Sequence, residues 1–406
     1  MGAITPMVRV PTVTTGAGTA VVAAPLAGPR LAAAVWRAWD RGDAILPLDP
    51  GAPASELRRL LARLRPTHLD DGGGPVPVSP AGWGAPPAPA APGTAAVVVT
   101  SGTTGTPKGV ELTRAGMEAM GRAYSEGVGA GPGDRWLACL PLHHVASLAV
   151  LARSYVTGVP HAVHEGFDVE RVGRAPRDEG ATIVSVVPTA LRRLLDAEVP
   201  LHEYRLVIVG GAPCPPALRA RAERAGVTVV DAYGMTETWG GFALDGVPVA
   251  GAQVRVAQDG ELLVRGPMVM RGYRLDDAQT AAVLDRDGWL HTGDVGTYDG
   301  RTVRVVDRKK DIVISGGVNV SPTEVEAVLS GHPALDDVCV VGVPDERWGE
   351  RVVAYVVSAR PPTVEDLRAF ARERLSAPKL PREVRVVDAI PRSPGGKPLR
   401  RLLRGG

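Results

Sequence analysis

The segment at residues 100–109 constrains this chain more strongly than any other part of it. It reads Thr-Ser-Gly-Thr-Thr-Gly-Thr-Pro-Lys-Gly, follows the apolar run at 95–99 and precedes Val-Glu-Leu at 110–112. Glycine lets backbone N–H groups turn toward an anion, the hydroxyl groups can donate hydrogen bonds to its oxygens, and Lys108 adds a positive charge. The pattern predicts a strand, a phosphate-binding loop and a second strand, followed by a helix from about Thr113.

Two other interpretations of this loop are less consistent with the residues. The P-loop of kinases and GTPases requires a glycine directly before the lysine and a serine or threonine directly after it. Pro107 and Gly109 occupy these positions, which excludes a P-loop. A surface turn without a ligand would rarely carry a lone lysine beside a proline. The loop therefore predicts a polyphosphate ligand.

At 406 residues the chain is too long for one ordinary domain, and its 45% hydrophobic residues allow a large core. The 46 basic and 44 acidic residues nearly balance, so the charge does not indicate nucleic acid or an anionic membrane as a partner. With no apolar run of about 18 residues and no secretory leader pattern, we expect a cytoplasmic protein with small-molecule partners. The cysteines lack metal or redox spacing and are expected to be reduced: Cys139, Cys214 and Cys339.

Helix and strand patterns alternate along the first 230 residues. Helices are predicted at 31–40, 55–65, 146–155 and 216–225, and strands at 44–50, 95–99, 136–140, 182–187, 205–209 and 228–230. This alternation predicts an α/β fold with doubly wound sheets, in which ligands bind beyond the carboxyl ends of the strands. The stretch 70–93 is so rich in Gly, Pro and Ala that we expect a poorly ordered connector.

After about residue 250 the pattern changes to short strands separated by Gly/Asp turns, which predicts a small antiparallel β subdomain. The charged pentapeptide 307–311 separates this part from a final segment with an α+β pattern. We therefore predict a large N-terminal domain over 1–307 and a small α+β C-terminal domain over 308–406.

Residues 231–238 directly follow the predicted strand at 228–230, where a doubly wound sheet presents its ligand. Tyr233 can stack on a purine, the Thr236 hydroxyl can bind a phosphate, and Glu237 can hold a Mg²⁺ ion that also contacts phosphate oxygens. The alternative is an ordinary strand-to-helix turn. The presence of the phosphate-binding pattern in the same chain favours a nucleotide site.

Three further polar motifs each allow two interpretations. Asp294 can accept hydrogen bonds from ribose hydroxyls or can be a turn aspartate. Arg308 and Lys310 lie in the charged pentapeptide. In one interpretation Arg308 contacts the nucleotide and Lys310 is a pivot between domains; in the other, both belong to a solvated hinge. Lys397 follows two glycines, so it can reach into a cleft of another domain or belong to a basic tail.

These five motifs, in this order and at these separations, resemble the adenylate-forming superfamily of AMP-binding enzymes and acyl-CoA synthetases over about residues 31–406. The resemblance implies ATP, Mg²⁺ and coenzyme A as cofactors. It implies phosphate binding by the first loop, through Thr100, Ser101, Gly102, Thr103, Thr104, Gly105 and Lys108. It also implies the other nucleotide contacts: Gly211, Ala212 and Tyr233 at adenine, Asp294 at ribose, Arg308 beside the nucleotide and Glu237 at Mg²⁺.

The same resemblance assigns the catalytic roles. Lys397 would assist formation of an acyl-adenylate, with Thr236 and Glu237 at the same centre, and His144 would border the acyl pocket. A cation delivered to the reacting phosphate stabilises the transition state more than the ground state.

The resemblance further implies a mobile C-terminal domain. This domain would rotate about a hinge at Lys310 after adenylation, which removes Lys397 and opens a pantetheine channel near Gly316 and Gly317. The acyl-AMP would form with release of pyrophosphate, and the product of the second step would be a CoA thioester.

Within the superfamily, the segment 143–154 and the short chain are most similar to 2-succinylbenzoate–CoA ligases of actinobacterial type, in the menaquinone pathway. The chain reaches the phosphate loop at residue 100, so we expect a shortened N-terminal subdomain. Gly240 and Gly241 leave room for an aromatic acid, but the sequence does not locate the cation that a dianionic acid requires. Three alternatives remain: an adenylation enzyme that loads a carrier protein or forms an amide, a fatty acyl-CoA synthetase, and a nucleotide-binding protein without activity.

Histidines offer one competing metal-binding pattern, formed by His143, His144, His161 and His164. No cysteine or carboxylate completes a convincing ligand set with them. We therefore assign the metal to Glu237 instead.

Overall fold

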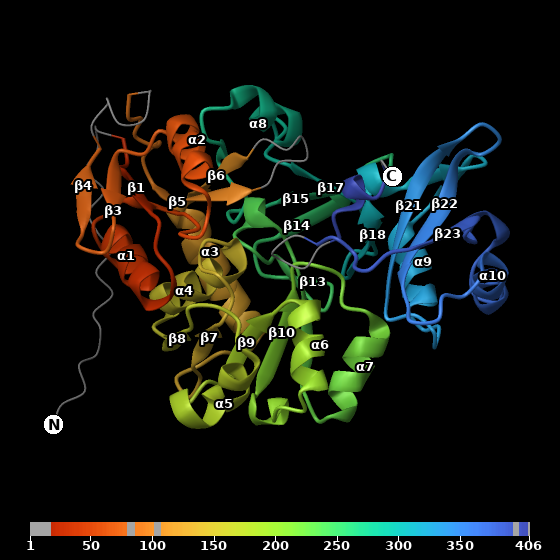
Figure 1. Ribbon diagram of the computed structural model, residues 1–406. Coiled ribbons are helices and arrows are strands. Elements are labelled where there is room, and N and C mark those ends of the chain that lie inside the picture. Colours follow the sequence, from red (N-terminus) through yellow and green to blue (C-terminus); the bar gives the residue numbers. More distant parts are fainter. Residues whose placement is uncertain (1–17, 79–85, 101–106, 393–397, 405–406) are drawn as a thin grey trace.

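The computed structural model describes residues 18–78, 86–100, 107–392 and 398–404 (Figure 1). Two groups of predicted site residues lie outside this range. They are Ser101, Gly102, Thr103, Thr104 and Gly105 of the phosphate-binding loop, and Lys397 near the C-terminus.

The first sheet has seven strands in the order β16-β6-β5-β2-β1-β3-β4. Strands β5, β2, β1 and β3 are parallel neighbours, and antiparallel strands complete both ends. Strand β5 is buried over 94–98 because its side chains are apolar on both faces, as expected for a strand covered by helices. The strands are β1 Val21–Ala24, β2 Ala44–Pro47, β3 His68–Asp70, β4 Pro75–Pro77, β5 Thr94–Thr100, β6 Lys108–Thr113 and β16 Gly272–Tyr273.

The second sheet also has seven strands, in the order β13-β12-β11-β10-β9-β7-β8. Its strands are parallel from β8 to β11, and β12 and β13 extend it in antiparallel fashion. The strands are β7 Trp136–Ala138, β8 His161–Val163, β9 Ile183–Val186, β10 Leu206–Gly210, β11 Val229–Tyr233, β12 Ala243–Leu244 and β13 Val247–Pro248.

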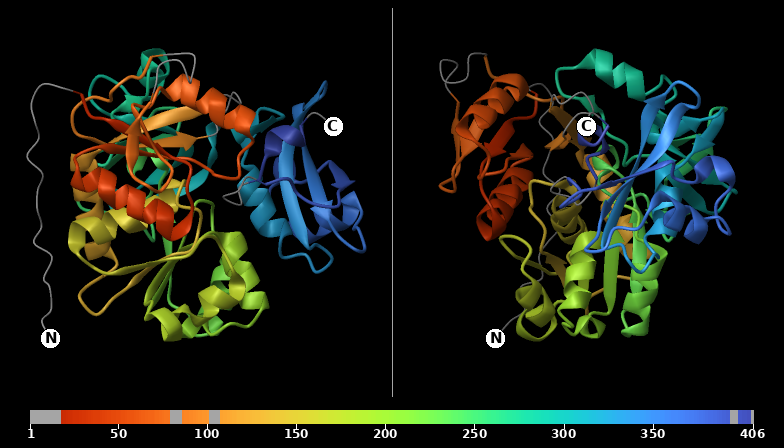
Figure 2. Two further views of the ribbon diagram at one scale, coloured as in Figure 1. Left: turned by 60° about the vertical axis from the view of Figure 1, so that its left-hand side comes forward. Right: turned by 45° about the vertical axis from the view of Figure 1, so that its right-hand side comes forward.

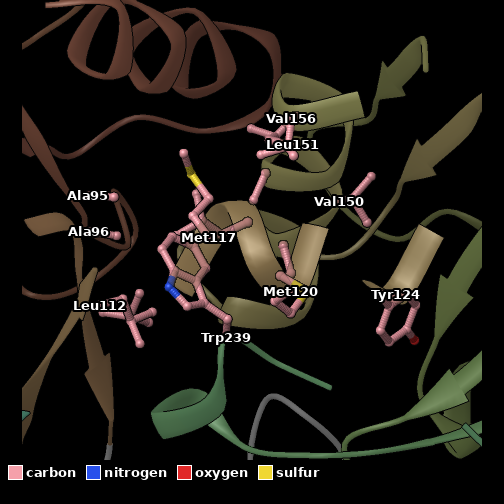
Figure 3. Close-up of a cluster of buried hydrophobic side chains, with 14 of the residues drawn as sticks. Ala95, Ala96, Leu112, Met117, Met120, Tyr124, Val150, Leu151, Val156 and Trp239 are labelled. Carbon is pink, nitrogen blue, oxygen red and sulfur yellow. The ribbon is translucent and has the colours of Figure 1, made fainter. Parts of the chain in front are cut away.

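Helices cover both faces of both sheets, which confirms the predicted doubly wound α/β fold. Helices α1 (Gly28–Asp40), α3 (Arg114–Gly127) and α4 (Val145–Thr157) share one buried core with both sheets. Figure 3 shows part of it, where Met117 and Met120 of α3 lie near Trp239. The outer faces are covered by α2 (Ala54–Leu64) on the first sheet, and by α5 (Val169–Glu179), α6 (Pro188–Asp196) and α7 (Pro216–Arg224) on the second.

A four-stranded antiparallel sheet follows, in the order β14-β15-β17-β18, and confirms the predicted β subdomain. Its strands are β14 Gln253–Val256, β15 Glu261–Arg265, β17 Leu290–Tyr298 and β18 Val303–Arg308, and the short helix α8 (Asp277–Val283) precedes β17. Asp294 and Arg308 are direct neighbours across β17 and β18.

The C-terminal part is α+β, as predicted, and has its own hydrophobic core (blue in Figures 1 and 2). Strands β20, β19, β22 and β21 are adjacent in this order, and β23 lies parallel to β22. The elements are β19 Val313–Ser315, β20 Val318–Val320, α9 Pro322–Leu329, β21 Asp337–Asp345, β22 Gly349–Val357, α10 Val364–Ala371 and β23 Glu383–Val386. The domain boundary at 307/308 stays a prediction.

Two segments differ from their sequence-based interpretation. Within the predicted connector, β4 pairs with β3, and the buried Asp70 carboxylate accepts hydrogen bonds from Arg37 and from the backbone of Gly72 and Gly74. One buried aspartate thus orders a turn at the start of a segment that its Gly/Pro composition predicted to be a poorly ordered connector. Strand β11 continues to Tyr233, so Tyr233 lies at the end of the strand and not after it. No helix of the described residues is long and apolar enough to cross a membrane.

Candidate functional site

The phosphate-binding pattern lies between two paired strands. Thr100, the last residue of β5, is directly opposite Lys108, the first residue of β6, so the described ends confirm the predicted strand–loop–strand arrangement. The Nζ atom of Lys108 lies 4.5 Å from the centroid of the Tyr273 ring. The Tyr273 hydroxyl donates a hydrogen bond of 2.8 Å to Oε1 of Glu237. Tyr273 therefore lies between two predicted ligands of the nucleotide and metal.

Glu237 is held on a tight turn. It lies with Thr236 in the 3-10 helix Thr236–Thr238, and its carbonyl accepts a hydrogen bond of 2.7 Å from the backbone N–H of Met270. A Cβ atom on Gly234 would lie 1.9 Å from the Gly240 carbonyl oxygen, so only glycine fits where these two loops meet. The backbone around Glu237 is thus fixed by packing and hydrogen bonds on both sides.

Tyr233, Asp294 and Arg308 form one polar network. The Tyr233 hydroxyl donates to Oδ2 of Asp294 at 2.8 Å, and Nε of Arg308 lies 2.8 Å from Oδ1 of the same carboxylate. Asp294 is only 4% exposed, and Arg308 also donates to the Thr292 carbonyl at 3.0 Å. Burial and the neighbouring Asp294 carboxylate raise the pKa of Tyr233 well above its usual value, so the phenol remains a donor. The structure thus brings three predicted nucleotide contacts together.

Gly211 and Ala212 begin the turn after β10, at the same sheet edge as Tyr233. Gly210 is paired with Ala232 of β11, and a Cβ atom on Gly210 would lie 3.1 Å from the Ala232 carbonyl oxygen. Gly211 has φ +79°, a left-handed conformation that favours glycine. The turn therefore lies at the carboxyl edge of the sheet, next to the strand that carries Tyr233, where a parallel sheet binds its ligands.

His144 directly precedes α4 and contacts His143, with 4.3 Å between ring centroids. Burial, together with the neighbouring His143, lowers the pKa of His144 to about 4, so its imidazole is neutral at pH 7. Its buried Nε2 has no hydrogen-bond partner among the described residues. His161 and His164 bind Ser154 and Glu179 instead. Among the described parts of the chain, no group of three or more His, Cys, Asp or Glu side chains could hold a metal ion.

Arg153 on α4 was not identified from the sequence. It is 3% exposed, and its guanidinium lies 3.6 Å from the centroid of the Tyr124 ring and 5.3 Å from that of Trp136. No described carboxylate lies within ion-pair distance, and its Nε and Nη1 have no hydrogen-bond partner in the described part of the chain. A Cβ atom on Gly241 would lie 2.7 Å from Tyr124 Cε2, so the Tyr124 ring also lies against this glycine. The available signal was one basic residue inside an otherwise apolar helix.

The predicted hinge is bracketed by two anchored residues. Lys309 binds the carboxylates of Asp259 and Glu261, at 2.6 and 3.2 Å, in the antiparallel sheet. The buried Asp311 lies near Arg400 and Arg404 of the C-terminal part. Lys310, between them, is exposed and forms no ion pair with any described carboxylate.

Gly316 and Gly317 form the turn between β19 and β20, with φ values of +59° and +77°. A Cβ atom on Gly316 would meet the Trp348 ring at 3.1 Å, within the C-terminal part. The described contacts therefore place this turn on the C-terminal part, and not with Tyr233, Asp294 and Arg308.

The described residues fit a nucleotide and a magnesium ion. Mg²⁺ is commonly held by one or two carboxylates together with substrate phosphates, and Glu237 supplies one carboxylate beside Lys108. The buried Asp294 supplies a carboxylate acceptor beside the Tyr233 hydroxyl.

Comparisons with known proteins agree with this arrangement. The AMP-binding enzyme family matches residues 65–274, and the AMP-binding enzyme C-terminal domain matches residues 324–397. A Mycobacterium tuberculosis protein named "Probable 2-succinylbenzoate--CoA ligase" is 40% identical over 317 residues, which cover 75% of this chain and 82% of that protein.

Two solved structures are similar along nearly the whole chain. The o-succinylbenzoate CoA synthetase from Bacillus subtilis, in complex with the acyl-adenylate intermediate OSB-AMP, has a TM-score of 0.82 at 29% identity and covers 95% of this chain and 88% of its own. The amide bond synthetase McbA from Marinactinospora thermotolerans has a TM-score of 0.83 at 31% identity, with 96% and 90% covered. Since the family match alone spans more than half of the sequence, this chain belongs to the AMP-binding enzyme family.

Proposed function

We propose that the protein is an AMP-forming acid–CoA ligase. It activates a carboxylic acid as an acyl-adenylate with release of pyrophosphate, and then transfers the acyl group to the thiol of coenzyme A. Two contact groups among the predicted site residues carry this proposal. Lys108 and Glu237 both contact Tyr273, and Tyr233, Asp294 and Arg308 form one polar network.

Each of these groups has a role in binding ATP. The loop from Thr100 to Lys108 holds the β- and γ-phosphates, while Gly211, Ala212 and Tyr233 border adenine. Asp294 accepts hydrogen bonds from the ribose, and Arg308 orients that carboxylate through its ion pair. Glu237, beside Thr236, is the ligand for Mg²⁺, which when bound withdraws charge from the phosphate oxygens.

We propose 2-succinylbenzoate as the acid, because Arg153 supplies the cation that a dianionic substrate requires. Its guanidinium is buried without a described carboxylate partner, an arrangement that is costly unless an anion binds there. The Tyr124 ring lies against both Arg153 and Gly241. His144, which we propose to border the acyl group, is neutral and adds no competing charge.

We further propose that residues 1–307 and 308–406 are domains that reorient between the two half-reactions. The anchors at Lys309 and Asp311 leave Lys310 as the residue about which they turn. Lys397 then serves adenylation, and the Gly316–Gly317 turn serves the entry of pantetheine. A cytoplasmic location fits these small-molecule substrates.

A pyrophosphate-release assay with ATP, Mg²⁺ and a panel of acids tests the proposal. The panel contains 2-succinylbenzoate, benzoate, octanoate and a no-acid blank, each with and without coenzyme A. We expect 2-succinylbenzoate to give the highest rate and a CoA thioester as the product. Absence of pyrophosphate release with every acid would contradict the enzymatic function, and preference for octanoate would contradict the substrate.

A second candidate is amide formation, which the similarity to the amide bond synthetase favours. In that case 2-succinylbenzoate or another acid would support exchange of labelled pyrophosphate into ATP, and an amine would replace coenzyme A as the acceptor. Mass spectrometry of the products with CoA and amine present together distinguishes the two.

A further inference from the structure

Tyr273 lies where the two halves of the proposed ATP site meet. Its ring is next to the Nζ atom of Lys108 at 4.5 Å from the centroid, and its hydroxyl is 2.8 Å from Oε1 of Glu237. One side chain therefore contacts both the cation predicted for the phosphates and the carboxylate predicted for the metal. Tyr273 is 8% exposed, so solvent competes little for either contact.

Strand pairing explains how Tyr273 reaches Lys108. Strand β16 is antiparallel to β6 and places Tyr273 opposite Val110. Lys108 is two residues before Val110, so it is the diagonal neighbour of Tyr273 on the same face, within reach of a long side chain. The Tyr273 backbone N–H is also fixed by a hydrogen bond of 2.8 Å to Thr280 Oγ1.

The next residue, Arg274, anchors this strand from the other face. Its backbone N–H donates to the Gly109 carbonyl at 2.7 Å, and its guanidinium binds Glu111 at 2.8 Å. The same guanidinium donates to the backbone carbonyls of Leu64, Arg65 and Ala88. Because these contacts are buried, the position of Tyr273 is set before any ligand binds.

We propose that Tyr273 is a positioning residue that orients Lys108 through its ring and Glu237 through its hydroxyl. The proposal rests on the proposed function and adds a physical link between the phosphate-binding and metal-binding residues. The ring attracts the ammonium group by a cation–π interaction and limits the directions in which the lysine can extend. The hydroxyl occupies one lone pair of the carboxylate and leaves its other oxygen to face the ligand.

The two contacts can be separated by two substitutions. Tyr273→Phe keeps the ring beside Lys108 and removes only the hydrogen bond to Glu237. Tyr273→Leu removes both the ring and the hydroxyl. Tyr298→Phe is the matched control, since the Tyr298 hydroxyl bonds only to the Gly300 carbonyl in a surface turn of the antiparallel sheet.

Calorimetry of ATP binding, with Mg²⁺ or with EDTA, is the main measurement. For Tyr273→Phe we expect the ATP affinity in EDTA to stay within about 2-fold of the wild type. The factor by which Mg²⁺ increases the ATP affinity should be about 10-fold smaller than in the wild type, because one hydrogen bond to a charged group is lost. For Tyr273→Leu we expect an additional loss of about 3- to 10-fold in EDTA, because the cation–π contact is removed as well. Thermal melting of each variant verifies that it is folded.

The outcomes distinguish this proposal from the proposed function. If the wild-type protein does not bind ATP, the proposed function fails. If the wild type binds ATP with a clear gain from Mg²⁺ and folded Tyr273→Phe shows the same gain, only the positioning role fails. An equal loss in EDTA and in Mg²⁺ for Tyr273→Phe also overturns it, because a merely structural change would weaken both alike.

Discussion

Asp294 and Arg308 are paired across neighbouring strands, with Arg308 Nε 2.8 Å from Asp294 Oδ1. Arg308 is the last residue of β18, and the proposed hinge at Lys310 follows two residues later. The carboxylate proposed to bind ribose therefore forms a partly buried ion pair with a residue at the start of the proposed hinge segment. The residues proposed for nucleotide binding and those proposed for the hinge thus meet at this pair.

Asp294→Asn tests the ribose contact. The amide keeps the shape of the carboxylate but loses its charge, so it accepts more weakly from ribose and leaves Arg308 without this ion pair. We expect the KM for ATP to rise about 10- to 100-fold, as for loss of charge-assisted hydrogen bonds. Steady-state kinetics with varied ATP measures this, with the exposed Asp287→Asn as the control. An unchanged KM would remove Asp294 from the nucleotide site.

Arg153→Met tests the assignment of the acid. Methionine fills similar space without charge, so we expect the KM for 2-succinylbenzoate to rise about 100-fold, the effect of losing a buried ion pair to the substrate. The melting temperature should stay equal or rise, because an unpaired buried cation is removed. Arg193→Met is the control, since Arg193 also lies over an aromatic ring but is exposed. A KM for 2-succinylbenzoate within 2-fold of the wild type would place the acid elsewhere.

His144 gives the protein a defined pH dependence of stability. The pKa of its imidazole is about 4 in the folded protein and about 6.5 in the unfolded chain. Between about pH 4 and pH 6.5 the imidazole is therefore protonated mainly in the unfolded state. The free energy of unfolding should therefore fall as the pH decreases from about 6.5 to about 4, by up to about 1.4 kcal/mol per pH unit from this group. Above pH 6.5 the contribution is complete.

Urea unfolding at several pH values measures this effect by comparison with His144→Gln. We expect the difference in stability between the wild type and His144→Gln to change across that pH range and to be constant above it. The exposed His202→Gln is the control. A difference that does not vary with pH would show that the native imidazole protonates as readily as the unfolded one.

Lys397→Ala tests the two-position mechanism, although Lys397 lies outside the described residues. Adenylation should fall by about 100-fold or more, because a cation at the reacting phosphate is lost. Thioester formation from supplied acyl-AMP should be unchanged, since the lysine is withdrawn for that step. Separate assays of the two half-reactions provide the comparison, with Arg401→Ala as an exposed basic control. Equal loss of both half-reactions would argue against separate domain positions.

Local patterns determined the fold class and most candidate site residues. The alternation of apolar runs and amphipathic segments predicted both doubly wound sheets, and the cluster of Gly, Ser, Thr and Lys predicted the phosphate loop. These signals are carried by neighbouring residues, which fix strand and helix periods. Local patterns missed two features that depend on contacts with other parts of the chain. The turn between β3 and β4 is ordered by the buried Asp70, and β11 extends to Tyr233 along the neighbouring strand β10.

The tertiary structure alone decided how the site residues support one another. The pairs Tyr233–Asp294 and Tyr273–Glu237 join residues 61 and 36 positions apart, and nothing in either local segment specifies the partner. Arg153 was not identified either, because a single basic residue in an apolar helix can face solvent or the core, and only the fold places it in the core. Sequence determined which chemical groups are present and on which elements they lie. Only the packing of α4 between the sheets and the pairing of β16 with β6 determined which groups are buried together, since burial and long-range contact depend on the whole fold.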